Sequence, residues 1–280
     1  MPSELFDIAQ GTLRLSIVFG VALFLPLILQ LLFLYAASWL LNRVVGLFSL
    51  LLYRLLKMIG TPVHELSHAL GCWITLAGVD AIKLLSDRYG VGFVQPRRQN
   101  LLSGVVSSVA PLFGATLVLW LTATQVIPGF EVPTVLPPQL DLESAASLGT
   151  VLRESMSYMG RFFETAFRNL PNLQWDNWQT YVGLYIALSV GMGITPSSQD
   201  LRILVAALPL ALLVGLGFFA WIYLSGNPQE QFLALQQGLV PALLTFSTAV
   251  TYAFVVASVG VLVFLPLAIL RKLVARSQVA

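Results

Sequence analysis

Both histidines of the chain stand in one pentapeptide, His64-Glu65-Leu66-Ser67-His68. On a helix, residues four positions apart lie on the same face, so both imidazoles can bind a single cation. Glu65 directly follows the first histidine and can reach a water molecule bound to that cation. Two histidines and one carboxylate, with water in the fourth position, are a donor set typical of zinc. The HExxH pattern therefore predicts a zinc site on a helix.

The third ligand of such a site must come from another part of the chain. Among the 13 acidic residues, only Glu65 and Asp200 lie within or between closely spaced apolar segments. An ionisable residue at membrane depth is costly and by default indicates a functional site. Asp200 follows Pro196 and two serines, which break a helix, and irregular backbone at that depth must be buried in protein or line a wet cavity. We therefore expect Asp200 to lie opposite His64 and His68 as the third metal ligand.

Other interpretations of these residues stay open at this point. The histidines could hydrogen-bond neighbouring helices, and Glu65 could pair with Arg54 or Lys57. Asp200 could pair with Arg202 at the inner membrane surface, and the third ligand could be another residue.

The composition indicates a membrane protein. Of the 280 residues, 57% are hydrophobic and 10% are charged, against about 25% charged residues in an ordinary soluble domain. Because the apolar runs extend over most of the chain, we expect one membrane domain over residues 1–280, in contact with the lipid bilayer. The net charge of +2 gathers into no basic block, which excludes nucleic-acid binding. The single cysteine excludes an internal disulfide framework.

Uncharged runs long enough to cross a hydrocarbon core of about 30 Å occur along the whole chain. They are residues 15–41, 101–129, 177–199, 203–227 and 239–265. Two shorter pieces, 44–59 and 62–77, lie between the first two runs. The second has Thr61 as N-cap, Pro62 at its first position and Gly78 after its end, and is only about 24 Å long. We therefore expect an all-α polytopic membrane protein with about six transmembrane helices, a short or re-entrant metal-binding helix and a small β-hairpin.

Two further segments have patterns of their own. Short β-prone stretches in residues 79–96 flank a turn-like segment from Ser86 to Gly90 and predict the hairpin. In residues 128–178, apolar residues recur at helical spacing opposite charged ones, which predicts an amphipathic helix at the membrane interface. The apolar residues of that helix are Leu148, Leu152, Met156, Met159, Phe163, Ala166 and Leu170. Basic residues gather in the 79–103 loop and in the tail, so we expect a cytoplasmic C-terminus and an extracytoplasmic 128–178 loop.

Together, these features resemble the site-2 protease family of intramembrane zinc metalloproteases. In that family an HExxH motif lies near the start of a transmembrane helix, an Asp on a later membrane segment is the third ligand, and a β-hairpin often follows the metal helix. The matching features here are His64, Glu65, His68, the 79–96 hairpin and Asp200. The resemblance covers residues 60–225, which we expect to form the metalloprotease core.

The resemblance implies hydrolysis of peptide bonds in membrane-spanning segments of substrate proteins. His64, His68 and Asp200 would hold Zn²⁺, which lowers the pKa of its water and polarises the scissile carbonyl, and Glu65 would take up and return the proton. An exposed edge of the hairpin could hold the unwound substrate by strand addition. Two alternatives remain: a non-catalytic membrane-client binding protein of the same fold, and an ion-coupled transporter. We expect a multi-pass protein of a prokaryotic inner membrane or an organellar membrane.

Overall fold

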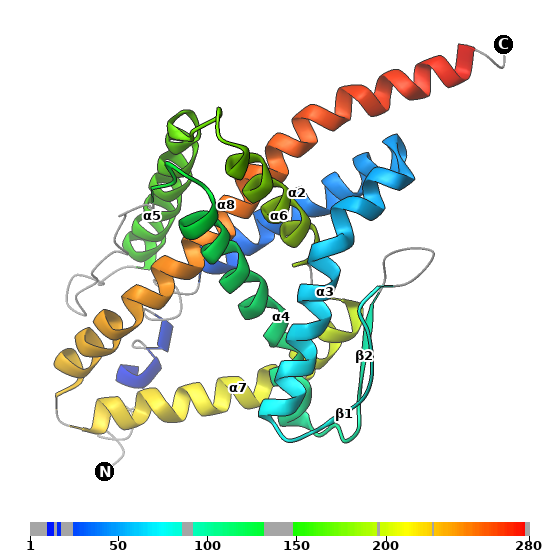
Figure 1. The fold of residues 1–280 in the computed structure, drawn as a ribbon. Coiled ribbons are helices and arrows are strands. Elements are labelled where there is room, and N and C mark those ends of the chain that lie inside the picture. The colour runs from blue at the N-terminus through cyan, green and yellow to red at the C-terminus, as the bar shows by residue number, and fades with distance from the viewer. Residues whose placement is uncertain are drawn as a thin grey trace.

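The computed structural model describes residues 10–13, 16–17, 25–85, 92–131, 148–194, 197–225 and 227–277. The fold is mostly helical, with one two-stranded antiparallel sheet (Figure 1). Its elements in chain order are α2 (Leu25–Phe48), α3 (Leu50–Ile74), β1 (Val79–Lys83), β2 (Phe93–Pro96), α4 (Leu101–Leu121), the π-helix η2 (Thr122–Val126), α5 (Leu148–Asn169), the 3-10 helix η3 (Leu170–Asn172), α6 (Trp178–Gly193), α7 (Ser198–Leu224) and α8 (Pro228–Ser277).

Within the described residues, four helical segments are long and apolar enough to cross a membrane, fewer than the six or so transmembrane helices that the sequence predicts. They are Leu25–Phe48, Leu101–Val126, Gln199–Leu224 and Leu233–Val274. The predicted run 177–199 gives α6, which has only 16 residues and a length of about 24 Å. It is too short because the helix ends at Gly193, ahead of the polar segment that leads to Asp200. Four candidate spans are still consistent with a multi-pass membrane protein.

The helix that carries the HExxH motif differs from the short helix predicted over 62–77, because it forms one 25-residue helix, α3. Its N-cap is Ser49, whose side chain accepts a hydrogen bond from the Leu52 N–H, and Pro62 lies inside it. At about 37 Å, α3 is long enough to cross a membrane. It is not among the four candidates, in keeping with its charged and polar residues.

Side chains of α6 explain why α3 continues through Pro62. A proline in a helix removes one N–H and disturbs the hydrogen-bond ladder of the preceding turn. Here Ser189 Oγ accepts the N–H groups of Ile59 at 3.2 Å and Gly60 at 2.9 Å. One turn earlier on α6, the Tyr185 hydroxyl donates to the Leu55 carbonyl at 2.7 Å. These bonds satisfy backbone groups that a break would expose, so the helix passes the proline without ending.

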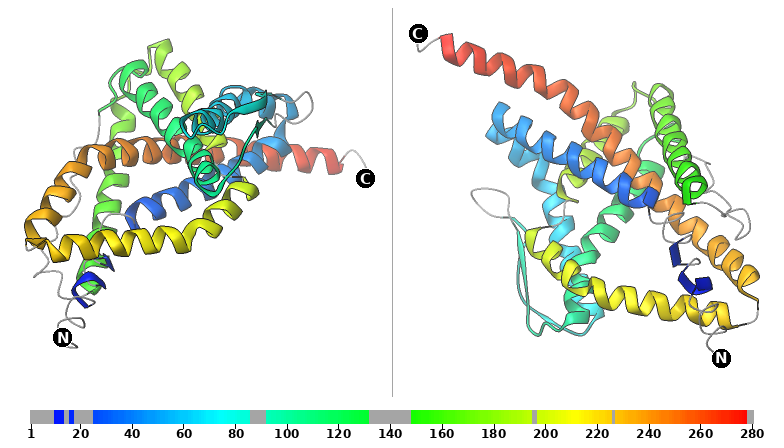
Figure 2. Two further views of the ribbon diagram at one scale, coloured as in Figure 1. Left: turned by 90° about the horizontal axis from the view of Figure 1, so that it is seen from below. Right: turned by 180° about the vertical axis from the view of Figure 1, so that it is seen from behind.

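Helix α3 packs between α4 and α6, and small residues allow both neighbours to approach its backbone (Figures 1 and 2). A Cβ at Gly71 would lie 2.7 Å from the Cα of Ser107 on α4. On the other side, a Cβ at Gly60 would overlap the Ser189 carbonyl of α6. Small residues at such contacts are typical of helix packing in membranes. They place α3 firmly between its neighbours at the level of the histidines.

The predicted hairpin is confirmed, with β1 and β2 antiparallel and Ile82 opposite Val94. The predicted turn at 86–90 lies outside the described residues. At the open end of the hairpin, Arg97 Nε donates to Asp80 Oδ1 at 2.8 Å, and this hydrogen bond raises the pKa of the guanidinium above its ordinary value. The hairpin lies alongside α3 (Figure 1).

The predicted amphipathic helix is present as α5, but its buried face is rotated from the predicted one. Tyr158, Met159 and Phe162 are buried, whereas Leu152 and Met156 are 38% and 48% exposed. The buried side chains pack toward α8 and α2, with Phe162 completely covered. The apolar pattern predicted the helix correctly, but packing against α8 and α2 determines which residues it buries.

Helix α7 starts beside α4 and extends away from the other helices before the chain turns into α8 (Figures 1 and 2). Its first turns contact α4, where Ile203 Cγ2 lies 3.4 Å from the position of a Cβ on Gly104. The rest of α7 is largely exposed and apolar, with Val205, Leu213 and Trp221 between 63% and 68% exposed. Only the start of α7 therefore takes part in the packing around α3.

Candidate metal centre

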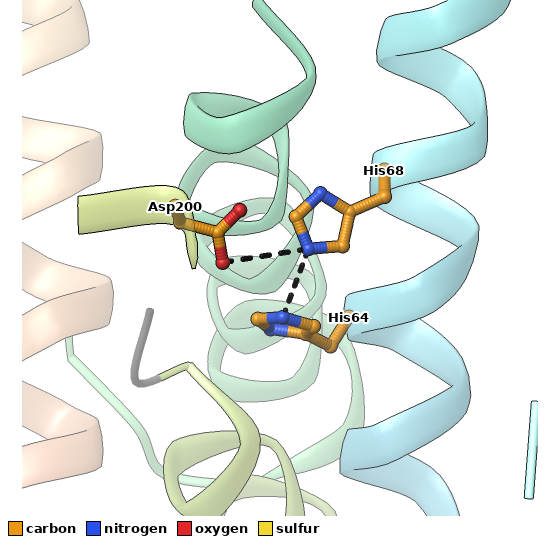
Figure 3. A group of neighbouring side chains, drawn as sticks. All are labelled: His64, His68 and Asp200. Atoms are coloured by element: carbon orange, nitrogen blue, oxygen red, sulfur yellow. Dashed lines mark hydrogen bonds and ion pairs between the residues drawn. The ribbon is translucent and has the colours of Figure 1, made fainter. Parts of the chain in front are cut away.

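The two histidines of the motif face each other on α3 (Figure 3). Their Nε2 atoms lie 3.1 Å apart, as the spacing of one helical turn predicts. The rings cross edge to face, with 4.7 Å between centroids. Both side chains are half-buried. The Nδ1 atom of His64 has no hydrogen-bond partner in the part of the chain that the structure describes.

A backbone carbonyl determines which nitrogen of His68 carries the proton. His68 Nδ1 lies 2.8 Å from the carbonyl oxygen of Ser107 on α4. Because a carbonyl oxygen can only accept a hydrogen bond, Nδ1 carries the hydrogen and donates it. In the neutral ring, Nε2 is then left with its lone pair. A hydrogen bond from the ring nitrogen that faces away from the metal to a carbonyl is typical of metal-binding histidines.

Asp200 reaches the histidines from the first turn of α7. Its Oδ2 atom lies 3.7 Å from His68 Nε2, and the residue is only 5% exposed. The same oxygen accepts hydrogen bonds from the Ser197 N–H at 2.9 Å and the Ser197 hydroxyl at 2.6 Å. Ser197 Oγ in turn accepts from the Asp200 N–H at 3.1 Å, which completes a capping box. The helix cap thus orients the carboxylate toward the histidines.

The predicted break before Asp200 is present, because α6 ends at Gly193 and α7 begins at Ser198. Thr195 and Pro196, on which the prediction partly depended, lie outside the described residues. The break brings Asp200, 132 positions beyond His68, next to the two histidines. One ligand-capable atom from each of His64, His68 and Asp200 lies within 4.8 Å of the others.

The spacing and chemistry of these three atoms fit a zinc ion. Ligand atoms about 2.1 Å from zinc at tetrahedral angles lie about 3.4 Å from one another. The observed separations from His68 Nε2, 3.1 Å to His64 and 3.7 Å to Asp200, lie on either side of that value. The tautomer of His68 directs a lone pair toward the shared space, and Asp200 contributes a carboxylate oxygen. The donor set therefore matches three protein ligands of an open zinc site, with Cys72 outside the group.

Glu65 lies next to this group on α3 and is covered by the hairpin. It is buried, with 8% of its surface exposed. A Cβ at Gly92, immediately before β2, would overlap Cγ of Glu65 and would lie 2.7 Å from the Lys83 carbonyl oxygen. Glycine at this position therefore lets the hairpin approach the carboxylate closely. Gly92 could not be identified from the sequence, because its only local signal is a glycine at the edge of a strand.

The structure thus brings together the residues that the sequence selected, and adds partners that it did not. His64, His68 and Asp200 form one cluster, with Glu65 beside it on α3. Whether this cluster binds zinc stays a prediction. Ser197 could have been identified from its pattern, because Ser followed three residues later by Asp is typical of a helix cap.

Comparison with known families gives one match. Residues 30–129 match the family model described as Peptidase M50B-like. Comparison with curated proteins and comparison with solved structures each give no significant match. The matched segment includes the HExxH motif, the hairpin and α4, and it ends before Asp200. Over residues 30–129 the chain is therefore similar to the Peptidase M50B-like family, in keeping with the resemblance to site-2 proteases that its motif predicted.

Proposed function

We propose that this protein is an intramembrane zinc metalloendopeptidase that hydrolyses peptide bonds in membrane-spanning segments of other proteins. One observation carries the proposal: His64 and His68 on α3 converge with Asp200 on α7, while Glu65 lies beside them on α3. Convergence of the only two histidines with an acid from a distant helix is hard to explain by packing alone, because burying these groups is costly without a common partner. The Peptidase M50B-like match supports the same conclusion.

The roles of the side chains follow from their chemistry. His64, His68 and Asp200 would hold the zinc ion, which when bound polarises a carbonyl and makes water more acidic. Glu65 accepts a proton from the attacking water and delivers it to the nitrogen of the departing amine. Burial beneath Gly92 limits the access of bulk water to the Glu65 carboxylate. Asp200 is kept in place by the capping box, so its carboxylate does not need to reorganise during turnover.

An apolar cavity beside the cluster supports a membrane-spanning substrate. The cavity has a volume of about 440 Å³ and lies between α2, α4 and the start of α7. Its lining includes Ser108, adjacent to the carbonyl that holds His68, and Leu201, adjacent to Asp200. Most of the remaining lining is aliphatic and suits the apolar side chains of a membrane segment. In the described part of the chain the sheet has only two strands, so each strand of the hairpin has an outer edge at which an unwound stretch of substrate would pair.

The test is cleavage by the purified full-length chain in lipid vesicles that contain synthetic single-span peptides of varied sequence. We expect cleavage within the apolar segment by the wild type, and loss of cleavage by at least about 100-fold in Glu65→Gln. Zinc content is measured in the same samples, because Glu65→Gln keeps all three ligands. Asp176→Asn is the matched control, since this acid is exposed and lies away from the cluster. Full cleavage by Glu65→Gln would overturn the proposal.

The same samples separate the alternatives. A wild type that binds zinc and peptides but cleaves none of them would favour the non-catalytic client-binding function. Metal-independent ion uptake that requires Asp200 would favour the transporter. Either result would contradict an endopeptidase.

A further inference from the structure

We propose that Pro111 is a positioning residue for His68. By lacking an N–H group, Pro111 leaves the Ser107 carbonyl free to accept the hydrogen on His68 Nδ1. The inference rests on the proposed metal-binding role of His68, but its central observable, the position of the ring hydrogen, is present without metal.

The proposal starts from the register of α4. In an α-helix, each carbonyl accepts the N–H of the residue four positions later, so the partner of Ser107 is position 111. That position is Pro111, which lies inside the continuous helix Leu101–Leu121. Proline has no N–H, and its ring also presses against the carbonyl four residues earlier. The Ser107 carbonyl therefore has no helical donor at position 111.

The Ser107 carbonyl has a specific partner outside its own helix. His68 Nδ1 lies 2.8 Å from it, across the contact between α3 and α4. Ser107 and Pro111 are both buried, so water is a poor competitor for this oxygen. A buried carbonyl without a donor is costly, and the imidazole N–H satisfies it. The Ser107 carbonyl on α4 and the imidazole N–H on α3 thus satisfy each other's hydrogen-bonding needs.

The hydrogen bond at Nδ1 determines the state of the other ring nitrogen, Nε2. With the hydrogen held on Nδ1, His68 Nε2 presents its lone pair toward His64 and Asp200. An alanine at position 111 would restore the helical N–H and draw the Ser107 carbonyl back toward the helix axis. The imidazole would then share or lose its acceptor, and the preference for hydrogen on Nδ1 would weaken. Removing a hydrogen bond that orients a metal-binding histidine lowers metal affinity by about 10–100-fold.

The experiment uses the full-length, metal-free protein in detergent with ¹⁵N-labelled histidine. The chain has only two histidines, so the ring nitrogens give few signals, and His64→Gln assigns them. We expect the wild type to hold His68 as the Nδ1–H tautomer, and Pro111→Ala to show a mixture of tautomers. Zinc affinity, measured against a competing chelator, is expected to fall about 10-fold or more in Pro111→Ala.

Two further variants separate the freed carbonyl from a general effect on the helix. Pro266→Ala is the matched control, because Pro266 also lies inside a helix, α8, but on an exposed surface. It should leave the tautomer and the affinity unchanged. Replacing Pro111 with the α-hydroxy analogue of alanine introduces a backbone ester that has no N–H and no ring. This ester should restore the wild-type tautomer and affinity.

The inference is overturned if Pro111→Ala keeps the pure Nδ1–H tautomer, or if the ester behaves like Pro111→Ala. A wild type that binds no zinc but shows the tautomer shift in Pro111→Ala would contradict the proposed function and leave this inference supported. If wild type and Pro111→Ala bind zinc equally and have the same tautomer, the inference about Pro111 is contradicted and the proposed function stays supported.

Discussion

Replacing Gly71 with alanine should separate α3 from α4 and loosen the contact that orients His68. The new Cβ would lie 2.7 Å from the Cα of Ser107, whereas carbon atoms in contact are normally about 3.5–4.0 Å apart. Because the clash is with backbone rather than with the end of a flexible side chain, the helices must separate by about 1 Å. The same displacement would lengthen the 2.8 Å bond from His68 Nδ1 to the Ser107 carbonyl beyond the roughly 3.2 Å limit for such bonds.

Helix propensity and packing change the stability of Gly71→Ala in opposite directions. Alanine is a better helix former than glycine by about 1 kcal/mol, so without a clash the variant would be more stable. Overpacking a tight contact costs about 1–3 kcal/mol, so we expect net destabilisation together with zinc affinity reduced about 10-fold or more. Gly215→Ala on α7 is the control, because nothing lies within 4 Å of its added Cβ.

The assays are reversible unfolding in mixed micelles and zinc competition with a chelator, both on the full-length chain. If Gly71→Ala is as stable as Gly215→Ala and binds zinc as tightly as the wild type, the α3–α4 contact does not position His68, and the reasoning is wrong.

Three further predictions concern the other parts of the site. Ser197→Ala removes the hydroxyl that donates to Asp200 Oδ2, so it should lower stability by about 1 kcal/mol through loss of the helix cap and should weaken zinc binding. Ser197→Thr keeps a hydroxyl and should keep both the cap and the zinc affinity. Competition with a chelator measures the affinities, and equal values for Ser197→Ala and wild type would contradict the prediction. Gly92→Ala places a Cβ against Glu65 Cγ, so peptide cleavage should slow while the zinc content stays unchanged. An unaltered rate in the peptide assay would argue against close contact between the hairpin and Glu65. Removal of zinc by dialysis against a chelator should abolish cleavage, and added zinc should restore it. Full activity in a sample that elemental analysis shows to be free of metal would contradict a metal-dependent reaction.

The fold could be predicted from the sequence where local signals decide the structure. The hairpin follows from two β-prone stretches around a turn-like segment, and the break before α7 from a run of residues that disfavour helix. The extent of α3 could not be predicted in this way. Pro62 is a strong local signal for a helix start, but Ser189 and Tyr185 of α6 satisfy the groups that it disturbs. Those residues lie about 130 positions away, so no local pattern connects them to Pro62.

The candidate site likewise has residues that the sequence predicts and contacts that it does not. The spacing of His64 and His68 is a property of the helix period, and Asp200 stands out because a carboxylate among apolar segments is costly. The contacts of the Ser107 carbonyl and of Gly92 depend on how closely α4 and the hairpin approach α3. In the sequence, the only sign of such a close approach is a glycine, and glycine also occurs at turns, helix caps and bulges. These contacts therefore required the three-dimensional structure.

The most direct test of the central claim is the zinc content of the purified full-length protein, measured by elemental analysis. We expect about one zinc ion per chain in the wild type, retained in Asp176→Asn and lost or strongly reduced in His68→Ala and Asp200→Ala. A well-folded wild type without metal after loading with zinc would contradict the account, and so would an Asp200→Ala variant that binds zinc as tightly as the wild type.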